Sequence, residues 1–165
     1  MRLFIALNLN DEIKTTLTEI QASMRRQGVR GNFTKAENLH LTLTFIGDYP
    51  DPEFVIDSLH AVPPPSFSIS LEGFESFGNL YWVGIQKCEV LSAYVKRLRK
   101  TLSDNNIPFD QKKFSPHITL IRQASMKNGL PHILVPDARL EVRHIALMRS
   151  DRTKSGMVYT ELDRV

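Results

Sequence analysis

One arrangement occurs twice in this chain and constrains the fold more than any other feature. In each half, a strand pattern and a long helical pattern are followed by an irregular link and a strand that carries His-x-Thr-Leu. The two motifs span 40–43 and 117–120, and their histidines lie 77 residues apart. A period this long with two copies does not fit a solenoid and predicts a duplicated α+β unit, two lobes related by a pseudo-two-fold axis. The alternative is a chance coincidence, because strand–helix–strand order is common in mixed domains.

Hydrophobic spacing predicts where the elements lie. Ile13, Leu17, Ile20 and Met24 form one apolar stripe, so a helix is expected over 11–27, with Asn10 as its N-cap. A constant offset of 77 matches Phe4 with Tyr81, Ile5 with Trp82, and Ile13 with Val90. The other predicted helices are 52–60 and 89–105, and the predicted strands are 2–9, 39–47, 67–73, 80–86 and 116–122, with a closing hairpin of 140–149 and 156–164. The three prolines at 63–65 are interpreted as a connector between the halves.

Composition limits the class of protein. The 165 residues are 42% hydrophobic and 24% charged, which is typical of a globular chain, so we expect residues 1–165 to form one bilobal domain. That domain is expected to be α+β, with two antiparallel sheets and outer helices around a central cleft. The 21 basic and 18 acidic residues permit an anionic partner without demonstrating one. The single cysteine, Cys88, excludes an internal disulfide, and no signal or membrane segment is evident, so we expect a soluble, cytoplasmic protein.

The two His-x-Thr segments are the candidate functional residues. Residues i and i+2 of a strand point to the same face, so His40 shares a face with Thr42 and His117 shares one with Thr119. Leucine and isoleucine take the opposite, buried face of each strand. If the lobes are related by a two-fold axis, two imidazoles and two hydroxyls can meet around one ligand.

That set of side chains suits general acid–base chemistry at a phosphate. Imidazole titrates near pH ~6.5, so a neutral ring can take a proton from water while a protonated ring gives one to a leaving oxygen. Threonine hydroxyls can donate to phosphate oxygens, and neither a covalent nucleophile nor a metal is required. Two alternatives stay open at this point. A single His-x-Thr is more often a structural histidine, and a zinc site usually needs three or four ligands, which neither motif supplies.

Basic residues gather in three clusters, of which the first and third precede the histidine strands and could flank the cleft. They are Arg25, Arg26, Arg30 and Lys35; Lys96, Arg97, Arg99 and Lys100; and Lys112 and Lys113. Solvated helix faces and loops are the usual explanation of such runs. Arg122 is a sharper candidate, but strict alternation places it on the apolar face with Ile118 and Leu120. It can contact a phosphate only if the strand ends or twists before it.

The paired segments HLTLTFIGD and FSPHITLIR resemble the two signature motifs of the 2H phosphoesterase superfamily. The nearest group is the RNA 2′,3′-cyclic phosphodiesterases, also known as 2′-5′ RNA ligases or LigT-like proteins. The strands RLFIAL, LYWVGI and YTEL extend the resemblance over nearly the whole chain.

This resemblance implies a bilobal fold, and metal-independent opening of an RNA 2′,3′-cyclic phosphate to leave a 2′-phosphate. His40 is then the proton donor to the departing 3′ oxygen and His117 the proton acceptor that activates water. Thr42, Thr119 and Arg122 are the implied phosphate ligands. No cofactor or membrane is implied, the partner is RNA with a cyclic phosphate end, and we expect a monomer. Joining RNA ends through a 2′-5′ bond is an implied side activity.

Two other functions remain open from the sequence. One is a phosphodiesterase for a small nucleotide, such as a cyclic-phosphate derivative of ADP-ribose, which would turn over a mononucleotide as fast as a long RNA. The other is an RNA-end binding module without turnover, although binding alone does not require two titrating rings.

Overall fold

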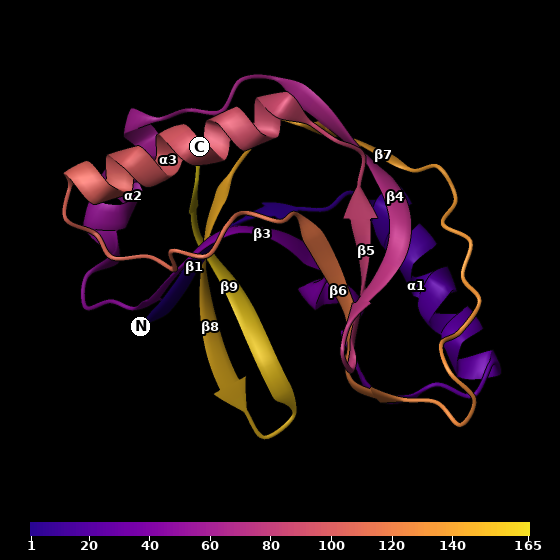
Figure 1. Cartoon of the computed structure of the whole chain (residues 1–165). Coiled ribbons are helices and arrows are strands. Elements are labelled where there is room, and N and C mark those ends of the chain that lie inside the picture. Colours follow the sequence, from indigo (N-terminus) through magenta and orange to yellow (C-terminus); the bar gives the residue numbers. More distant parts are fainter.

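The computed structural model describes residues 1–165 and confirms the expected α+β class, with two antiparallel sheets and three helices (Figure 1). One sheet has the order β3-β1-β8-β9 and the other β2-β6-β5-β4-β7. The strands are β1 Arg2–Asn8, β2 Arg30–Phe33, β3 His40–Asp48, β4 Phe67–Phe77, β5 Leu80–Ile85, β6 His117–Ser125, β7 Arg139–Val142, β8 Ala146–Thr153 and β9 Gly156–Arg164. The helices are α1 Asp11–Arg26, α2 Pro52–Ala61 and α3 Glu89–Asp104, with a 3-10 turn at Ala36–Asn38.

The helices cross between the two sheets. α1 follows β1 of the first sheet but packs on the second, where it contacts β7 and where Gln21 donates to the Leu120 carbonyl of β6. α3 follows β5 of the second sheet but packs with α2 on the first, against β3 and β8 (Figure 1). β2 of the first half also joins the second sheet. Each of the two sheets is therefore completed by elements from both sequence halves.

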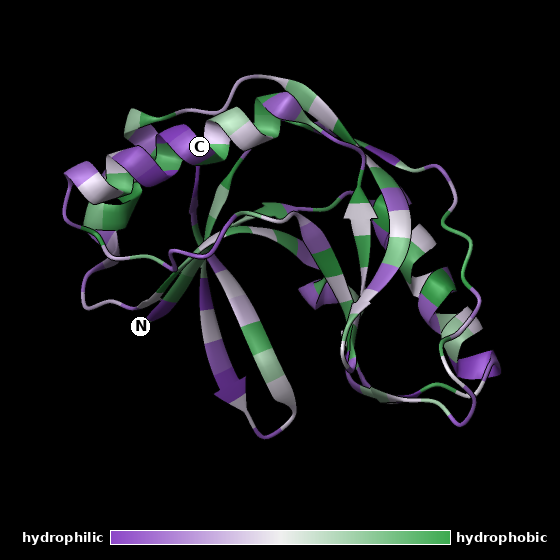
Figure 2. Cartoon of the chain, in the orientation of Figure 1, coloured by the Kyte–Doolittle hydropathy of each residue, from purple (hydrophilic) through white to green (hydrophobic).

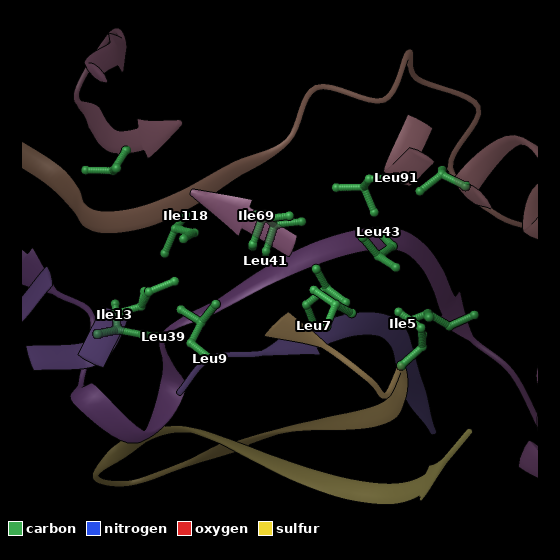
Figure 3. Close-up of a cluster of buried hydrophobic side chains, with 14 of the residues drawn as sticks. Ile5, Leu7, Leu9, Ile13, Leu39, Leu41, Leu43, Ile69, Leu91 and Ile118 are labelled. Carbon is green, nitrogen blue, oxygen red and sulfur yellow. The ribbon is translucent and has the colours of Figure 1, made fainter. Parts of the chain in front are cut away.

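The two sheets share one hydrophobic core. Ile5 and Leu7 of β1 and Leu41 and Leu43 of β3 lie in the same buried cluster as Ile118 of β6 (Figure 3). Hydrophobic and hydrophilic bands alternate along the strands and helices, which shows that one side of each element faces this core (Figure 2). The shared core fixes the two histidine strands relative to each other, and β3 and β6 approach closely.

The observed strand registers show that equivalent positions of the two halves are not separated by 77 residues throughout. In the first sheet Ile5 pairs with Thr44 and Ala6 with Thr42, and in the second Tyr81 pairs with Ile121 and Trp82 with Thr119. Trp82 therefore corresponds to Ala6, at a separation of 76, and not to Ile5. The buried helix positions match at 78 instead, which pairs Ile13 with Leu91 and Met24 with Leu102. Only the histidine motifs keep 77, because the connections before and after each helix differ in length.

The closing hairpin also differs from the prediction. Residues 140–149 are not one strand, because residues 143–145 are irregular and interrupt it. β7 before the break pairs with β4 in the second sheet, whereas β8 after it pairs with β1 and β9 in the first. β2 was not predicted, and β4 extends four residues beyond Gly73, which has φ 78° where a bulge interrupts its pairing with β5.

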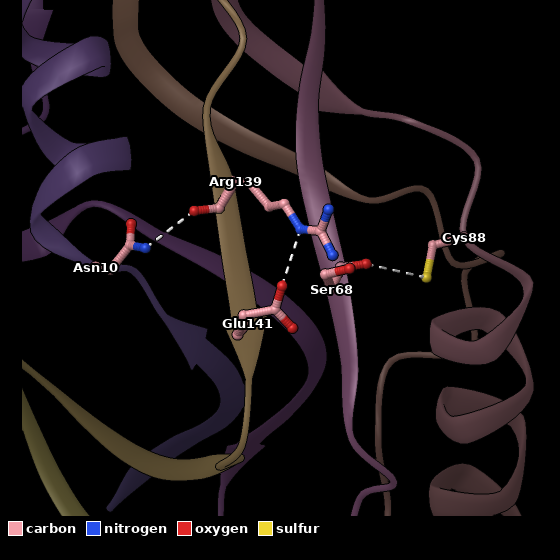
Figure 4. Close-up of polar contacts among 5 residues, drawn as sticks. All are labelled: Asn10, Ser68, Cys88, Arg139 and Glu141. Atoms are coloured by element: carbon pink, nitrogen blue, oxygen red, sulfur yellow. Dashed lines mark hydrogen bonds and ion pairs between the residues drawn. The ribbon is translucent and has the colours of Figure 1, made fainter.

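Polar contacts hold the edge of the second sheet (Figure 4). Asn10 caps α1 through Oδ1, which accepts from the Ile13 amide at 3.0 Å, and its Nδ2 donates to the Arg139 carbonyl of β7 at 3.0 Å. Cys88, at the start of α3, lies 3.8 Å from the Ser68 carbonyl that its thiol faces. The thiol is therefore engaged at a strand–helix junction and does not line the cleft described below. None of the helices is long and apolar enough to cross a membrane.

Candidate active site

Both histidine strands carry a bulge immediately after the threonine. Leu43 is left unmatched between the Thr42 and Thr44 pairings of β3, and Leu120 between the Thr119 and Ile121 pairings of β6. An extra residue in one strand reverses the alternation beyond it. The fifth residue after each histidine therefore returns to the histidine face: Phe45 in β3 and Arg122 in β6.

The backbone around Arg122 is unusual on its other side as well. Gln123 adopts φ 53°, in the left-handed region that non-glycine residues rarely occupy. Gly31 of β2 approaches so closely that a Cβ there would lie 2.8 Å from the Gln123 carbonyl oxygen. The bulge, the left-handed residue and this close approach together set the position of Arg122 at the edge of the cleft.

All five side chains singled out in the sequence line one cleft of about 800 Å³ between the two sheets. β3 contributes His40 and Thr42, and β6 contributes His117, Thr119 and Arg122. The geometric condition for a shared ligand site is therefore met, since the two rings do not point into separate pockets.

His40 lies in an enclosed, aromatic part of the cleft. Its Nδ1 is 2.7 Å from the Asn38 carbonyl oxygen, so this nitrogen must carry a hydrogen, and its Nε2 is 2.9 Å from Thr42 Oγ1. The ring centroids of Phe4 and Tyr159 lie 5.0 and 5.1 Å away. When the ring is neutral, its bare Nε2 accepts the Thr42 hydroxyl hydrogen.

His117 has the same backbone contact but a more open environment. Its Nδ1 lies 2.7 Å from the Ser115 carbonyl oxygen, which again leaves Nε2 as the nitrogen available to a ligand. Trp82 and Phe77 flank the ring at centroid distances of 5.6 and 5.8 Å. No side chain occupies its Nε2 in the way that Thr42 occupies that of His40.

Burial lowers the pKa of His40 below its ordinary value of 6.5. The positive charges of Arg122 and His117 lower this pKa further, while the hydrogen bond to Asn38 opposes the shift. His40 is therefore neutral at pH 7, and a bound anion would favour its protonated form.

Part of the positive charge of the cleft comes from two arginines that the sequence did not single out. Arg2 and Arg152 line it together with Arg122, and no aspartate or glutamate does. None of the three predicted basic clusters lines the cleft; Lys35 alone lines a hollow that adjoins it. The sequence shows basic residues at the tip of the closing hairpin and Arg2 at the start of the first strand, but only the β1–β8 pairing places these residues near the histidines. Nowhere in the chain do three or more His, Cys, Asp or Glu side chains gather in a way that could hold a metal ion.

Comparison with known proteins agrees with this arrangement. The sequence model of a family described as LigT like Phosphoesterase matches the chain twice, over residues 7–81 and 83–159. Each matched range contains one His-x-Thr motif. Together the two ranges cover most of the chain.

Relatives match over nearly the full length. The RNA 2′,3′-cyclic phosphodiesterase of Thermotoga maritima is 29% identical, covering 98% of this chain and 93% of that protein. The Thermus thermophilus protein of the same name is 30% identical, with 99% and 89% covered. Escherichia coli LigT in its apo form superposes with a TM-score of 0.83 at 25% identity, covering 99% and 95%, and it has also been crystallised with phosphate. With its paired motifs, its fold and these relatives, the chain belongs to the LigT-like phosphoesterases of the 2H superfamily.

Proposed function

We propose that this chain opens the terminal 2′,3′-cyclic phosphate of RNA by hydrolysis, without a metal, and leaves a 2′-phosphate. One observation carries the proposal: two histidines with their Nδ1 atoms bound to backbone carbonyls share a cleft with Thr42, Thr119 and Arg122. The names of the full-length relatives support RNA as the substrate class, and the phosphate complex of Escherichia coli LigT supports a phosphate site.

The reaction needs one proton taken and one proton given. In our assignment His117 Nε2 accepts a proton from water as the water oxygen forms its bond to phosphorus. The bond between phosphorus and the 3′ oxygen breaks, and His40 Nε2–H donates its proton to that oxygen. His40 ends neutral and His117 protonated, and exchange with solvent restores the starting state. Such paired proton transfer contributes typically ~10²–10⁴ in rate for each group.

The contact between His40 and Thr42 links substrate binding to the protonation of His40. While His40 is neutral, its ring accepts the threonine hydroxyl hydrogen. The negative charge of a bound phosphate raises the pKa of His40 by opposing the lowering effect of Arg122 and His117. Once protonated, Nε2–H becomes the donor, so the Thr42 hydroxyl hydrogen is released to a phosphate oxygen. Thr119 and Arg122 supply further donors on the other side of the cleft.

The same attack with an alcohol gives ligation. If the 5′-hydroxyl of a second RNA takes the place of water, His117 accepts its proton and the 3′ oxygen leaves in the same way. The product is a 2′-5′ phosphodiester, and no nucleotide cofactor is consumed. We propose this joining as a side reaction that competes with hydrolysis at high RNA concentration.

Product analysis tests the assignment. RNA ending in a 2′,3′-cyclic phosphate is incubated with the protein in ¹⁸O-water and EDTA, and chromatography separates the 2′- and 3′-phosphate products. We expect a 2′-phosphate carrying one ¹⁸O, with turnover unaffected by EDTA. His40→Ala and His117→Ala should each lower the rate by ~10² or more. His144→Ala, at an exposed position outside the cleft, is the matched control.

Each other outcome of this experiment contradicts a defined part of the proposal. Loss of turnover in EDTA contradicts metal independence, and a 3′-phosphate product contradicts attack with departure of the 3′ oxygen. Tight, salt-sensitive binding of RNA ends without product would indicate a binding module in place of an enzyme.

A further inference from the structure

The cleft continues beyond the histidines into a second hollow of about 340 Å³, which we name the hairpin groove. One wall is formed by the end of β2 and the connection that follows it, over residues 32–38, and the other is the turn of the β8–β9 hairpin. Arg122, Arg152 and Tyr159 line both the cleft and the groove, so the two form one continuous channel. In Figure 1 this hairpin projects from the first sheet.

The groove is lined by cations without counter-charges. Lys35, Arg122, Arg152 and Lys154 contribute to its surface, and no aspartate or glutamate does. None of these four side chains forms an ion pair, whereas Arg149 on the same hairpin pairs with Asp151 at 2.8 Å. The formal net charge of the whole chain is only +3, whereas the groove carries four basic and no acidic side chains, so its local charge is strongly positive.

The groove is also held in shape. Lys35 Nζ donates to the Ser155 carbonyl at 2.7 Å, and the Asn38 side chain, which is buried, donates to the Met157 carbonyl at 2.9 Å. These two bonds connect the walls directly. An ammonium group has three hydrogens, so Lys35 retains two donors for a ligand after this contact. A preformed site of this kind reduces the entropy lost on binding.

We propose that the hairpin groove binds the phosphodiester backbone of the nucleotides that precede the cyclic phosphate, so that the preferred substrate is an oligonucleotide end. This inference rests on the proposed function. A cyclic phosphate occupies both the 2′ and 3′ oxygens, so the rest of the RNA can leave the cleft only through the 5′ oxygen of the terminal nucleoside. The next phosphate therefore lies along a path out of the cleft, and the continuous basic channel provides that path. A mononucleotide has no group to place there.

The test compares substrates of two lengths. We measure kcat/KM for a tetranucleotide ending in a 2′,3′-cyclic phosphate and for the corresponding mononucleotide, with Lys35→Ala, Lys154→Ala and the double variant, because both lysines line the groove and neither lines the cleft. For the tetranucleotide we expect a loss of about tenfold for the double variant, and a dependence on log[salt] that is shallower by about 0.7 for each lost contact. For the mononucleotide we expect values within about twofold of the unmodified protein. Lys112→Ala with Lys113→Ala removes the same charge outside the channel and should change neither.

Binding provides a readout that does not depend on turnover. We expect a tetranucleotide ending in a 2′-phosphate to bind more tightly than the mononucleotide 2′-phosphate, and the double variant to remove most of this difference. Equal kcat/KM for both lengths in the unmodified protein, or an equal loss for both lengths in the variant, would overturn the groove proposal while leaving the proposed function intact. Length-dependent binding without any turnover would do the reverse: it would support the groove and contradict the enzyme assignment.

Discussion

The two histidine strands have the same backbone geometry, but the side chains around their histidines differ. β3 and β6 both begin with histidine, keep threonine two residues later, and bulge at the following leucine. In each strand the fifth residue after histidine then returns to the cleft, but this residue is Phe45 in β3 and Arg122 in β6. We infer that the two halves are copies of one unit whose backbone geometry was retained while its side chains diverged.

That divergence makes a near-symmetric site chemically unequal. His40 lies among Phe4 and Tyr159 with its Nε2 held by Thr42, and burial lowers its pKa. His117 lies closer to solvent between Phe77 and Trp82, on the strand that also supplies the guanidinium. One strand thus provides a shielded ring whose pKa is lowered by burial, and the other provides a more accessible ring and a guanidinium in the same cleft. The predictions below test this inequality.

The largest effect should come from the histidines, and a substrate with a different leaving group should separate their roles. Against a cyclic phosphate, His40→Ala and His117→Ala should each lower kcat by ~10²–10⁴. Against bis(p-nitrophenyl) phosphate, whose leaving group departs as a stable anion, no proton donor is needed. With this substrate the kcat of His40→Ala should be close to that of the unmodified protein, whereas the kcat of His117→Ala should still be low. Recovery by His117→Ala alone would reverse the donor and acceptor assignment.

The next effect should distinguish the two residues that follow the bulges. Arg122→Ala removes a charged donor from the cleft and should lower kcat/KM by about 10². Phe45, whose side chain is 45% exposed, offers only contact area, so Phe45→Ala should cost about threefold. Arg122→Lys should recover part of the loss, because a point charge cannot replace a bidentate contact. Equal losses at the two positions would show that the strands contribute alike.

The sequence predicted the features that follow from the spacing of residues within a single strand or helix. Alternation alone put His40 with Thr42 and His117 with Thr119, and the predicted helix stripe that begins at Ile13 is buried as expected. Alternation could not predict that Arg122 faces the cleft. That orientation depends on a bulge, which arises from pairing with a strand that lies far away in sequence. Residues 140–149 were likewise predicted as one strand, because no glycine or proline marks the break that sends β7 and β8 to different sheets. An apolar stripe shows which face of a helix is buried but not which sheet covers it, so the exchange of α1 and α3 was not foreseeable.

A smaller effect should arise at Gln21, which is buried in α1 and supports the bulge of β6 only. Its Nε2 donates to the Leu120 carbonyl at 2.9 Å and to the Thr34 carbonyl at 2.8 Å. Gln21→Leu leaves both carbonyls without this donor, so we expect the free energy of unfolding to fall by about 1–3 kcal/mol.

Activity should reveal whether this contact acts through Arg122. We expect Gln21→Leu to lower kcat/KM by about tenfold, because a displaced bulge misplaces the guanidinium. In an Arg122→Ala background the same change should have almost no further effect on kcat/KM, although its effect on stability should persist. Additive losses of activity would show that Gln21 does not position Arg122.

The smallest effect concerns the proton on His40. We expect its ring to titrate below 6.5 in the free protein, as followed by NMR of the imidazole Cε1 proton, and to titrate higher when inorganic phosphate is bound. Between the lowered pKa and 6.5 the unfolded chain binds more protons than the folded one, so stability contributed by neutral His40 is fully present above pH 6.5 and declines as the pH falls. Urea unfolding at pH 7.5 and 5.5 should show this decline in the unmodified protein and less of it in His40→Gln. If the His40 ring titrates at the same pH with and without phosphate, its protonation does not depend on the anion. The chemical difference between the two strands would then have to come from Arg122 alone.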